Sequence, residues 1–192
     1  MDYPEYAKVG DRLYKINTDF RNAIKCNEIA TDDSIGDYER ALAVIYVLFD
    51  EEGINHYEDH EQLLERAKTY LLCGKELDLK NNEEQDMDYV EDMDYIEASF
   101  MSDYHIDLSE EKMHWWKFTK LINGLSNSEF GNCCVLNRIR NLRNYDIKDI
   151  KDSKEREKIL KAKDEVALKR NKKKATKEQQ ESAENLLKML NI

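Results

Sequence analysis

Helix-breaking residues are scarce in this chain. Pro4 is the single proline among 192 residues, and glycine occurs only six times. These two residue types most often interrupt regular structure, so their scarcity favours long helices joined by few turns. Hydrophobic residues make up 41% of the sequence, and a chain of this length can bury a core. The sequence therefore predicts a mainly α-helical fold.

A small β-hairpin is predicted before the first helix. Residues Tyr6 to Val9 and Arg12 to Ile16 can form two strands around a Gly10-Asp11 turn. A lone hairpin is marginally stable in water, so we expect it to pack on the helices that follow.

Hydrophobic spacing predicts six to eight helices in all. We expect Asn17 or Thr18 to cap the first and the second to begin within residues 34–37. The third should begin near Asp59 and end at Gly74. The expected inward residues of these three helices are Phe20, Ala23 and Ile24, then Tyr38, Leu42, Ile45, Tyr46 and Phe49, then Leu63, Leu64, Ala67, Tyr70 and Leu71.

Three more helices are expected in the centre of the chain. They should begin near Asp86, at a Ser109 cap, and at Ser126 or Ser128, with a break at Gly124. Their expected inward residues are Tyr89, Met93, Ile96, Phe100 and Tyr104, then Trp115, Phe118, Ile122 and Leu125, then Val135, Leu136, Ile139 and Leu142. The arginines of the last of these helices should point away from its apolar face; they are Arg138, Arg140 and Arg143.

The chain changes character near residue 150. Residues 1–150 are predicted to form a helical core domain, and residues 151–192 a basic helical extension with a terminal amphipathic helix. Thr176 opens a capping box before that last helix. Its apolar residues follow a helical spacing; they are Ala183, Leu186, Leu187 and Leu190. Such a helix can dock on a partner or fold back on its own domain.

Charge is divided unevenly along the sequence. Residues 1–111 hold 30 acidic and 10 basic side chains, whereas residues 112–192 hold 11 acidic and 20 basic ones. This polarity suggests head-to-tail self-association, although a solvated surface of mixed charge explains it equally well. The basic stretch 138–177 could bind nucleic acid, but the net charge of −20 on residues 1–111 opposes a duplex, and no known binding motif is present.

The sequence favours a reducing cytoplasm. Its four cysteines form no CxxC pair and no disulfide framework. The beginning of the chain lacks the basic and apolar regions of a signal peptide, so none is expected. The longest apolar run, residues 41–49, is too short to span a bilayer. We therefore expect no membrane partner.

A calcium site is considered and rejected. Carboxylates alternate in the near-repeat formed by residues 86–91 and 92–97, as they do in calcium-binding loops. Glu91 or Glu97 would stand where such a loop needs glycine. An acidic, solvated helix face is the better interpretation.

The histidines predict neither a metal site nor a catalytic site. His56 and His60 are four residues apart but lack a third ligand and the zinc-protease pattern. His114 has no nucleophile or acid that sequence alone can place beside it, and we expect it to be structural. We therefore predict no cofactor, no catalytic residue and no enzyme activity.

The two tryptophans are adjacent and predict a contact surface. Trp115 and Trp116 lie about 100° apart on a helix, so one can be buried while the other reaches the surface. Burying a tryptophan removes roughly 200 Å² from water, worth at most about 5 kcal/mol, which can stabilise a core or anchor a partner. The predicted protein-binding residues are Trp115, Trp116, Phe118, Leu186, Leu187 and Leu190.

The sequence resembles the phage gene-product-fifteen family over about residues 3–170. The resembling segments are Tyr6 to Arg21, Tyr95 to Phe100, Tyr104 to Leu108, His114 to Phe118 and Gly124-Leu125. That family occurs in tailed phages and prophages of Gram-positive bacteria, and its genes tend to lie between those of the major tail protein and the tape-measure protein.

The resemblance implies a non-enzymatic assembly factor in the host bacterial cytoplasm. Gene position is typical of tail assembly chaperones, which coat the tape-measure protein and recruit tail-tube subunits without remaining in the virion. The implied partners are the tape-measure protein and the major tail protein of the same phage. A structural virion component of the tail or head–tail connector is the first alternative, and a nucleic-acid-binding regulator the second.

Overall fold

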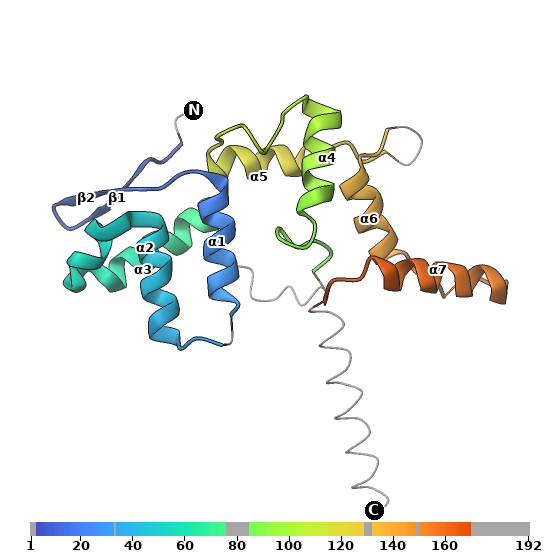
Figure 1. The fold of residues 1–192 in the computed structure, drawn as a ribbon, viewed down its shortest axis with the longest axis horizontal. Helices are drawn as coiled ribbons and strands as arrows, with labels where there is room; N and C mark the ends of the chain where they lie inside the picture. Colours follow the sequence, from blue (N-terminus) through green and yellow to red (C-terminus); the bar gives the residue numbers. More distant parts are fainter. Residues whose placement is uncertain (1–2, 33, 76–84, 129–131, 149, 170–192) are drawn as a thin grey trace, which may run out of the picture. The chain divides into compact units, whose positions relative to one another are not determined.

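The fold of this chain is mainly helical (Figure 1). The computed structural model describes residues 3–32, 34–75, 85–128, 132–148 and 150–169. Within these ranges it contains seven α-helices, one short 3-10 helix and an N-terminal two-stranded hairpin. The predicted fold class is thereby confirmed. The terminal helix with Leu186, Leu187 and Leu190 lies outside the described residues.

The chain forms two compact units. Unit 1 comprises residues 1–81 and 106–124, and unit 2 comprises residues 82–105 and 125–192. The proposed extension from residue 151 stays a prediction, since most of it lies outside the described residues.

The hairpin of unit 1 forms as expected. Strand β1 (Tyr6–Val9) pairs antiparallel with β2 (Arg12–Lys15), and Ala7 faces Tyr14 across the pair. Side chains alternate, so one face of the hairpin is buried while Tyr6 and Leu13 on the other are 56% and 61% exposed. The buried face packs on α2 and α3, the support that a short hairpin requires.

Four α-helices and a 3-10 turn complete unit 1. They are α1 (Phe20–Ala30), α2 (Asp37–Asn55), η1 (Tyr57–Asp59), α3 (His60–Leu71) and α5 (Trp115–Asn123). Helix α2 lies between α1 and α3, and α1 also packs on α5. The Phe20 and Phe118 rings stack with centroids 4.3 Å apart at the centre of this core.

Two details of the first helices differ from the prediction. Asp19, not Asn17 or Thr18, caps α1 through its carboxylate, which accepts the Arg21 backbone N–H at 3.0 Å. Tyr38 and Tyr46 of α2 are 68% and 53% exposed rather than inward. The buried hydrophobic residues of α2 are instead Val44, Ile45, Leu48 and Phe49. Tyrosine has a polar hydroxyl as well as an apolar ring, so it is often found at the protein surface.

Asn17 is used at a kink in α2. Asp50 has φ 54° and ψ −156°, a region that residues other than glycine rarely adopt. The Asn17 backbone N–H donates to the Leu48 carbonyl at 2.8 Å, and its side-chain amide donates to the Val47 carbonyl and the Asp50 carboxylate. Asn17, which follows the hairpin, thus donates hydrogen bonds to backbone carbonyls that the kink in α2 leaves available.

Asp59 joins the hairpin to the start of α3. Its Oδ2 accepts the Tyr14 hydroxyl at 2.6 Å and the Arg12 guanidinium at 2.8 Å. These two donors lower the pKa of Asp59. Burial and the same hydrogen bond raise the pKa of Tyr14 to about 12. The ionised carboxylate is therefore the stable form in the folded state.

We expect acid to destabilise unit 1 partly through Asp59. Below the ordinary aspartate pKa of about 3.9 the unfolded chain takes up a proton that the folded carboxylate resists, so stability falls as pH falls. Urea midpoints followed by tryptophan fluorescence, which reports unit 1, should drop less between pH 6 and pH 3 in Asp59→Asn than in the parent. Equal drops would contradict this role.

Unit 2 is built on α4 (Met93–Tyr104), α6 (Val135–Asn144) and α7 (Ser153–Glu165). Helix α4 packs on α6, and the Ser99 hydroxyl accepts the Leu136 backbone N–H at 3.0 Å. The buried apolar residues of unit 2 include Ile96, Phe100, Leu125, Leu136 and Leu168.

Three predicted helix starts are wrong. Residues 86–88 are irregular and residues 89–92 form a turn, because the Asp88 carboxylate accepts the backbone N–H groups of Val90 and Glu91. Ser109 lies in a turn held by Asp107, and α5 begins six residues later. Cys134 rather than Ser126 or Ser128 caps α6.

A buried ion pair ties the acidic segment to α6. Both terminal nitrogens of Arg143 donate to Asp92, at 2.7 Å each, and the two side chains are 9% and 1% exposed. Arg143 also donates to the backbone carbonyls of Asp86 and Val166. The prediction that Asp92 is solvated and Arg143 points away is therefore wrong. Opposite charges 51 residues apart leave no spacing signal in the sequence.

We expect Arg143→Ala to destabilise unit 2 by about 3–5 kcal/mol, because it leaves the Asp92 carboxylate buried and unpaired. Arg138→Ala, at an exposed position of the same helix, is the matched control and should change stability by no more than about 0.5 kcal/mol. Urea unfolding followed by far-ultraviolet circular dichroism measures both. Similar midpoints for the two variants would contradict the role of the pair.

Candidate protein-binding site around Trp116

Helix α5 begins at a histidine cap. The His114 Nδ1 accepts the Trp116 backbone N–H at 3.0 Å, and Nε2 lies 3.0 Å from the Pro4 carbonyl oxygen. A neutral ring with its proton on Nε2 satisfies both contacts. The ring also stacks on Tyr3 with centroids 4.8 Å apart. His114 thus fixes the entry to α5 and secures the beginning of the chain, in line with the structural role we expected.

The two tryptophans close the end of α3. Trp115 Nε1–H donates to the Leu71 carbonyl at 3.0 Å, and Trp116 Nε1–H donates to the Tyr70 carbonyl at 2.8 Å. Carbonyls in the last turn of a helix lack partners within it. The Tyr70 carbonyl also accepts the Cys73 backbone N–H at 3.0 Å, and the two indoles supply further donors to this helix end. Gly74 follows with φ 73°, and its Cα lies next to the Trp116 ring. An added Cβ would lie 3.4 Å from the Trp116 Cη2 atom.

The predicted binding residues separate into core and surface. Trp115 and Phe118 are 2% and 0% exposed and belong to the core of unit 1. Trp116 is half-buried, so the predicted division of the two tryptophans between core and surface holds. Leu186, Leu187 and Leu190 lie outside the described residues. Among the predicted protein-binding residues that the structure describes, Trp116 is therefore the one whose side chain can contact a partner.

Two mainly apolar hollows border Trp116, and together we call them the Trp116 surface. The first has a volume of about 250 Å³ and is lined by Tyr3, Cys73, Lys75, Trp116, Thr119, Lys120 and Asn123. The second, of about 290 Å³, is lined by Pro4, Tyr6, Ala7, Lys8, Ile16, Arg66, Thr69, Tyr70 and Trp116. The Trp116 ring is common to both, so a bound chain could contact it from either side.

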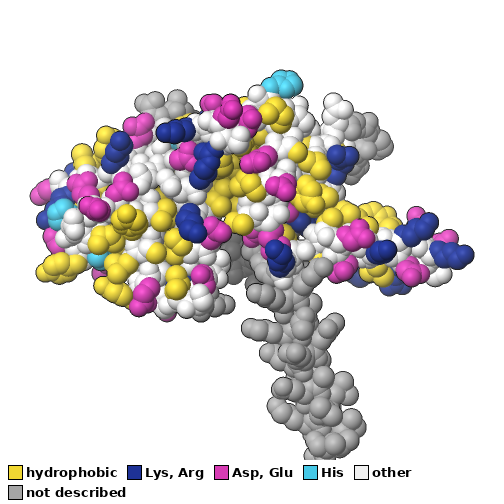
Figure 2. All heavy atoms as spheres, in the orientation of Figure 1, with side chains coloured by type: hydrophobic (Ala, Val, Ile, Leu, Met, Phe, Trp, Pro, Cys, Tyr) yellow, Lys and Arg dark blue, Asp and Glu magenta, His cyan; other side chains and the backbone are white. Residues whose placement is uncertain are grey.

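The Trp116 surface carries positive charge. Lys8, Arg66, Lys75 and Lys120 are among its lining residues, and none of the described residues that line it is acidic. The Lys120 ammonium lies 4.8 Å from the centroid of the Tyr3 ring. Figure 2 shows acidic side chains spread over much of the visible face, and residues 1–111 carry a net charge of −20. The surface is thus a basic, aromatic area on unit 1, which is built mostly from residues of the acidic segment 1–111.

Cys73, which lines the first hollow, has a thiol of low reactivity. The Cys73 Sγ lies 3.6 Å from the Thr119 hydroxyl, and burial raises the pKa of this thiol. A thiol kept protonated is a poor nucleophile.

The predicted absence of a histidine metal site concerns another part of unit 1. The rings of His56 and His60 contact the backbone carbonyls of Glu52 and Ile54. Within the described ranges no three His, Cys, Asp or Glu residues cluster as metal ligands.

Sequence reasoning missed most of this surface. Tyr3, Arg66 and Trp116 come from three distant segments, and no spacing rule connects them. The adjacent tryptophans were the one usable signal.

In the described part of the chain no helix has the length and apolar character needed to cross a membrane.

A family model described as Bacteriophage Gp15 protein matches residues 5–168. The chain belongs to this family. The resemblance noted in the sequence is thereby confirmed, and membership indicates a phage structural or morphogenesis protein. The chain has no match among curated proteins or among solved structures.

We expect the two adjacent tryptophans to differ in their effect on stability. Trp115→Ala removes a fully buried ring and should cost about 3–5 kcal/mol of unfolding free energy. Trp116→Ala removes a half-buried ring and should cost clearly less. Urea unfolding followed by circular dichroism compares the two, and a larger loss in Trp116→Ala would contradict the assignment of Trp115 to the core.

Proposed function

We propose that this Gp15-family protein acts as a phage tail assembly chaperone. In this proposal it binds the tape-measure protein and major tail protein in the host bacterial cytoplasm during tail morphogenesis. The observation that carries the proposal is the Trp116 surface, where a half-buried indole is flanked by two apolar hollows with basic and no acidic lining residues among those described. Family membership supports the general class of function.

The geometry of Trp116 suits a binding role. Tryptophan is enriched among residues that dominate protein–protein affinity. The bond from the Trp116 backbone N–H to His114 fixes the main chain, and the bond from the indole N–H to the Tyr70 carbonyl holds the ring before any partner arrives. A side chain that is already ordered loses little conformational entropy on binding, so more of the contact energy remains for affinity.

We expect Trp116→Ala to weaken capture of the client. The tagged chain would be co-expressed with the tape-measure protein and the major tail protein and recovered by affinity pull-down. Loss of a central tryptophan contact should reduce affinity by at least about tenfold. Tyr38→Ala, which removes an aromatic ring that is 68% exposed on α2, is the matched control. Equal recovery by both variants would contradict a role of the Trp116 surface, and no recovery by the parent chain would contradict the chaperone proposal.

The terminal segment is tested separately. Leu186, Leu187 and Leu190 stay predicted client contacts, so deletion of residues 176–192 should reduce recovery of the tape-measure protein. Unaltered recovery would remove the segment from the proposal. Self-association through opposite charges is also proposed, and light scattering should show assemblies at low salt that dissociate at high salt.

A structural virion component is the alternative within the same class. Mass spectrometry of purified phage particles distinguishes the two, because an assembly chaperone is absent from the mature particle. The basic helix α7 gives little support to the nucleic-acid alternative. It holds five basic residues and four acidic ones in the sequence of residues 153–165, and side chains of both signs lie along it (Figure 2).

A further inference from the structure

One edge of the hairpin offers unpaired backbone groups. The Ile16 N–H donates to the Glu5 carbonyl at 2.8 Å. Inward and outward backbone groups alternate along an antiparallel strand, so Tyr6 and Lys8 direct theirs away from β2. The contact between Arg66 Nε and the Lys8 carbonyl, at 3.1 Å, agrees with this geometry. The N–H groups of Tyr6 and Lys8 and the Tyr6 carbonyl have no hydrogen-bond partner among the residues that the structure describes.

The second hollow of the Trp116 surface borders this edge. Tyr6, Ala7 and Lys8 of β1 line it together with Arg66, Tyr70 and Trp116. The hollow is therefore bounded by a strand with outward backbone donors and by rings from α3 and α5. This arrangement is the one used when an extended peptide adds a strand to a sheet, with main-chain hydrogen bonds for affinity and side-chain pockets for specificity.

Charge selects the kind of strand that can add. Lys8 and Arg66 lie at the edge, and Lys75 and Lys120 lie across the Trp116 ring. An incoming segment with carboxylates would be attracted, whereas a basic one would be repelled. Edge-to-edge pairing of two copies of β1 would bring the Lys8 side chains of both copies to the same interface, and lysine on a strand edge opposes such pairing.

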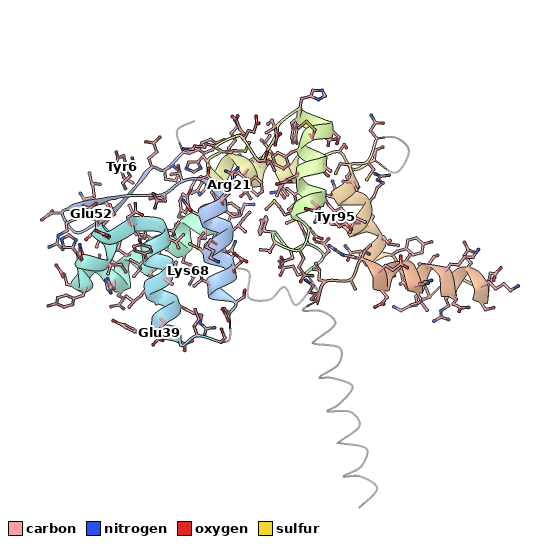
Figure 3. All side chains as sticks on the ribbon, in the orientation of Figure 1. Tyr6, Arg21, Glu39, Glu52, Lys68 and Tyr95 are labelled. Atoms are coloured by element: carbon pink, nitrogen blue, oxygen red, sulfur yellow. The ribbon has the colours of Figure 1, made fainter. Side chains whose placement is uncertain are left out.

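We propose that the outer edge of β1 is the docking site for an extended acidic segment of the client tape-measure protein. The segment adds as a third strand beside β1 and places a bulky apolar side chain in the hollow between Tyr6 and Trp116. The inference rests on the proposed function for the identity of the client. Tyr6, labelled in Figure 3, lies on the exposed face of the hairpin, with its backbone at the proposed junction.

Overlapping 15-residue peptides that cover the tape-measure protein of the same phage test the proposal, with scrambled versions as controls. Fluorescence anisotropy measures their binding to the full chain. Peptides that bind should be net acidic and contain a large apolar residue. Preferred binding of basic peptides would overturn the proposal. Failure of every peptide to bind, while the whole tape-measure protein is still captured in the pull-down, would overturn it and leave the chaperone function standing.

Two substitutions at one position isolate the backbone contact. Tyr6→Ala and Tyr6→Pro both remove the ring, but only proline removes the outward N–H, which takes no part in the pairing with β2. Tyr6→Pro should bind at least about tenfold more weakly than Tyr6→Ala. Equal affinities, with unchanged unfolding midpoints, would overturn the strand-addition geometry.

A second pair keeps the test decisive if Tyr6→Pro fails to fold. Lys8→Glu reverses the charge at the proposed edge, and Lys15→Glu makes the same change on the exposed face of β2. Lys8→Glu should weaken peptide binding at least about tenfold more than Lys15→Glu. Equal effects would overturn the proposal, as would a dimer of the chain, seen by sedimentation, that Lys8→Glu dissociates.

Discussion

The hydrogen bonds between two adjacent indoles and the end of α3 position much of unit 1. The indoles of Trp115 and Trp116 donate to the carbonyls of Leu71 and Tyr70. Helix α5 thus supplies hydrogen-bond donors to the end of α3, although the two helices lie far apart in the sequence. The His114 side chain caps the start of α5, and the same ring contacts the Pro4 carbonyl. From this junction follow the burial of Trp115, the half-exposure of Trp116, and the meeting of β1, α3 and α5 around the hollows.

Local patterns in the sequence predicted most of the secondary structure. The hairpin, the third helix and the split between the tryptophans depend on turn residues and periodicity, which act over a few positions. Helix starts were less predictable because several capping residues compete. Asp19 rather than Asn17 caps α1, since Asn17 pairs with the kinked α2, and His114 and Cys134 cap helices where the sequence suggested serine.

Long-range charge pairs and surfaces could not be predicted. The Asp92–Arg143 pair joins residues that look like parts of two solvated faces, and burial alone reveals their partnership. The candidate site has the same character. Trp116 could be singled out by residue type, but Lys8, Arg66 and Lys75 become neighbours only in the folded unit. Membership in the Gp15 family gives the class of function, and the geometry of these residues gives the proposed site.

Unit 1 is discontinuous in sequence, because residues 106–124 belong to it while the residues from 82 to 105 belong to unit 2. A ribosome therefore makes the hairpin and α1 to α3 well before their remaining helix. Phe20 lacks its stacking partner until Phe118 has emerged, and the end of α3 lacks both indoles. The proposed client-binding face, which includes Trp116, can consequently form only after the chain has been made past residue 116 of 192. Under the proposed function, the order of synthesis delays recognition of the client until unit 1 can also fold.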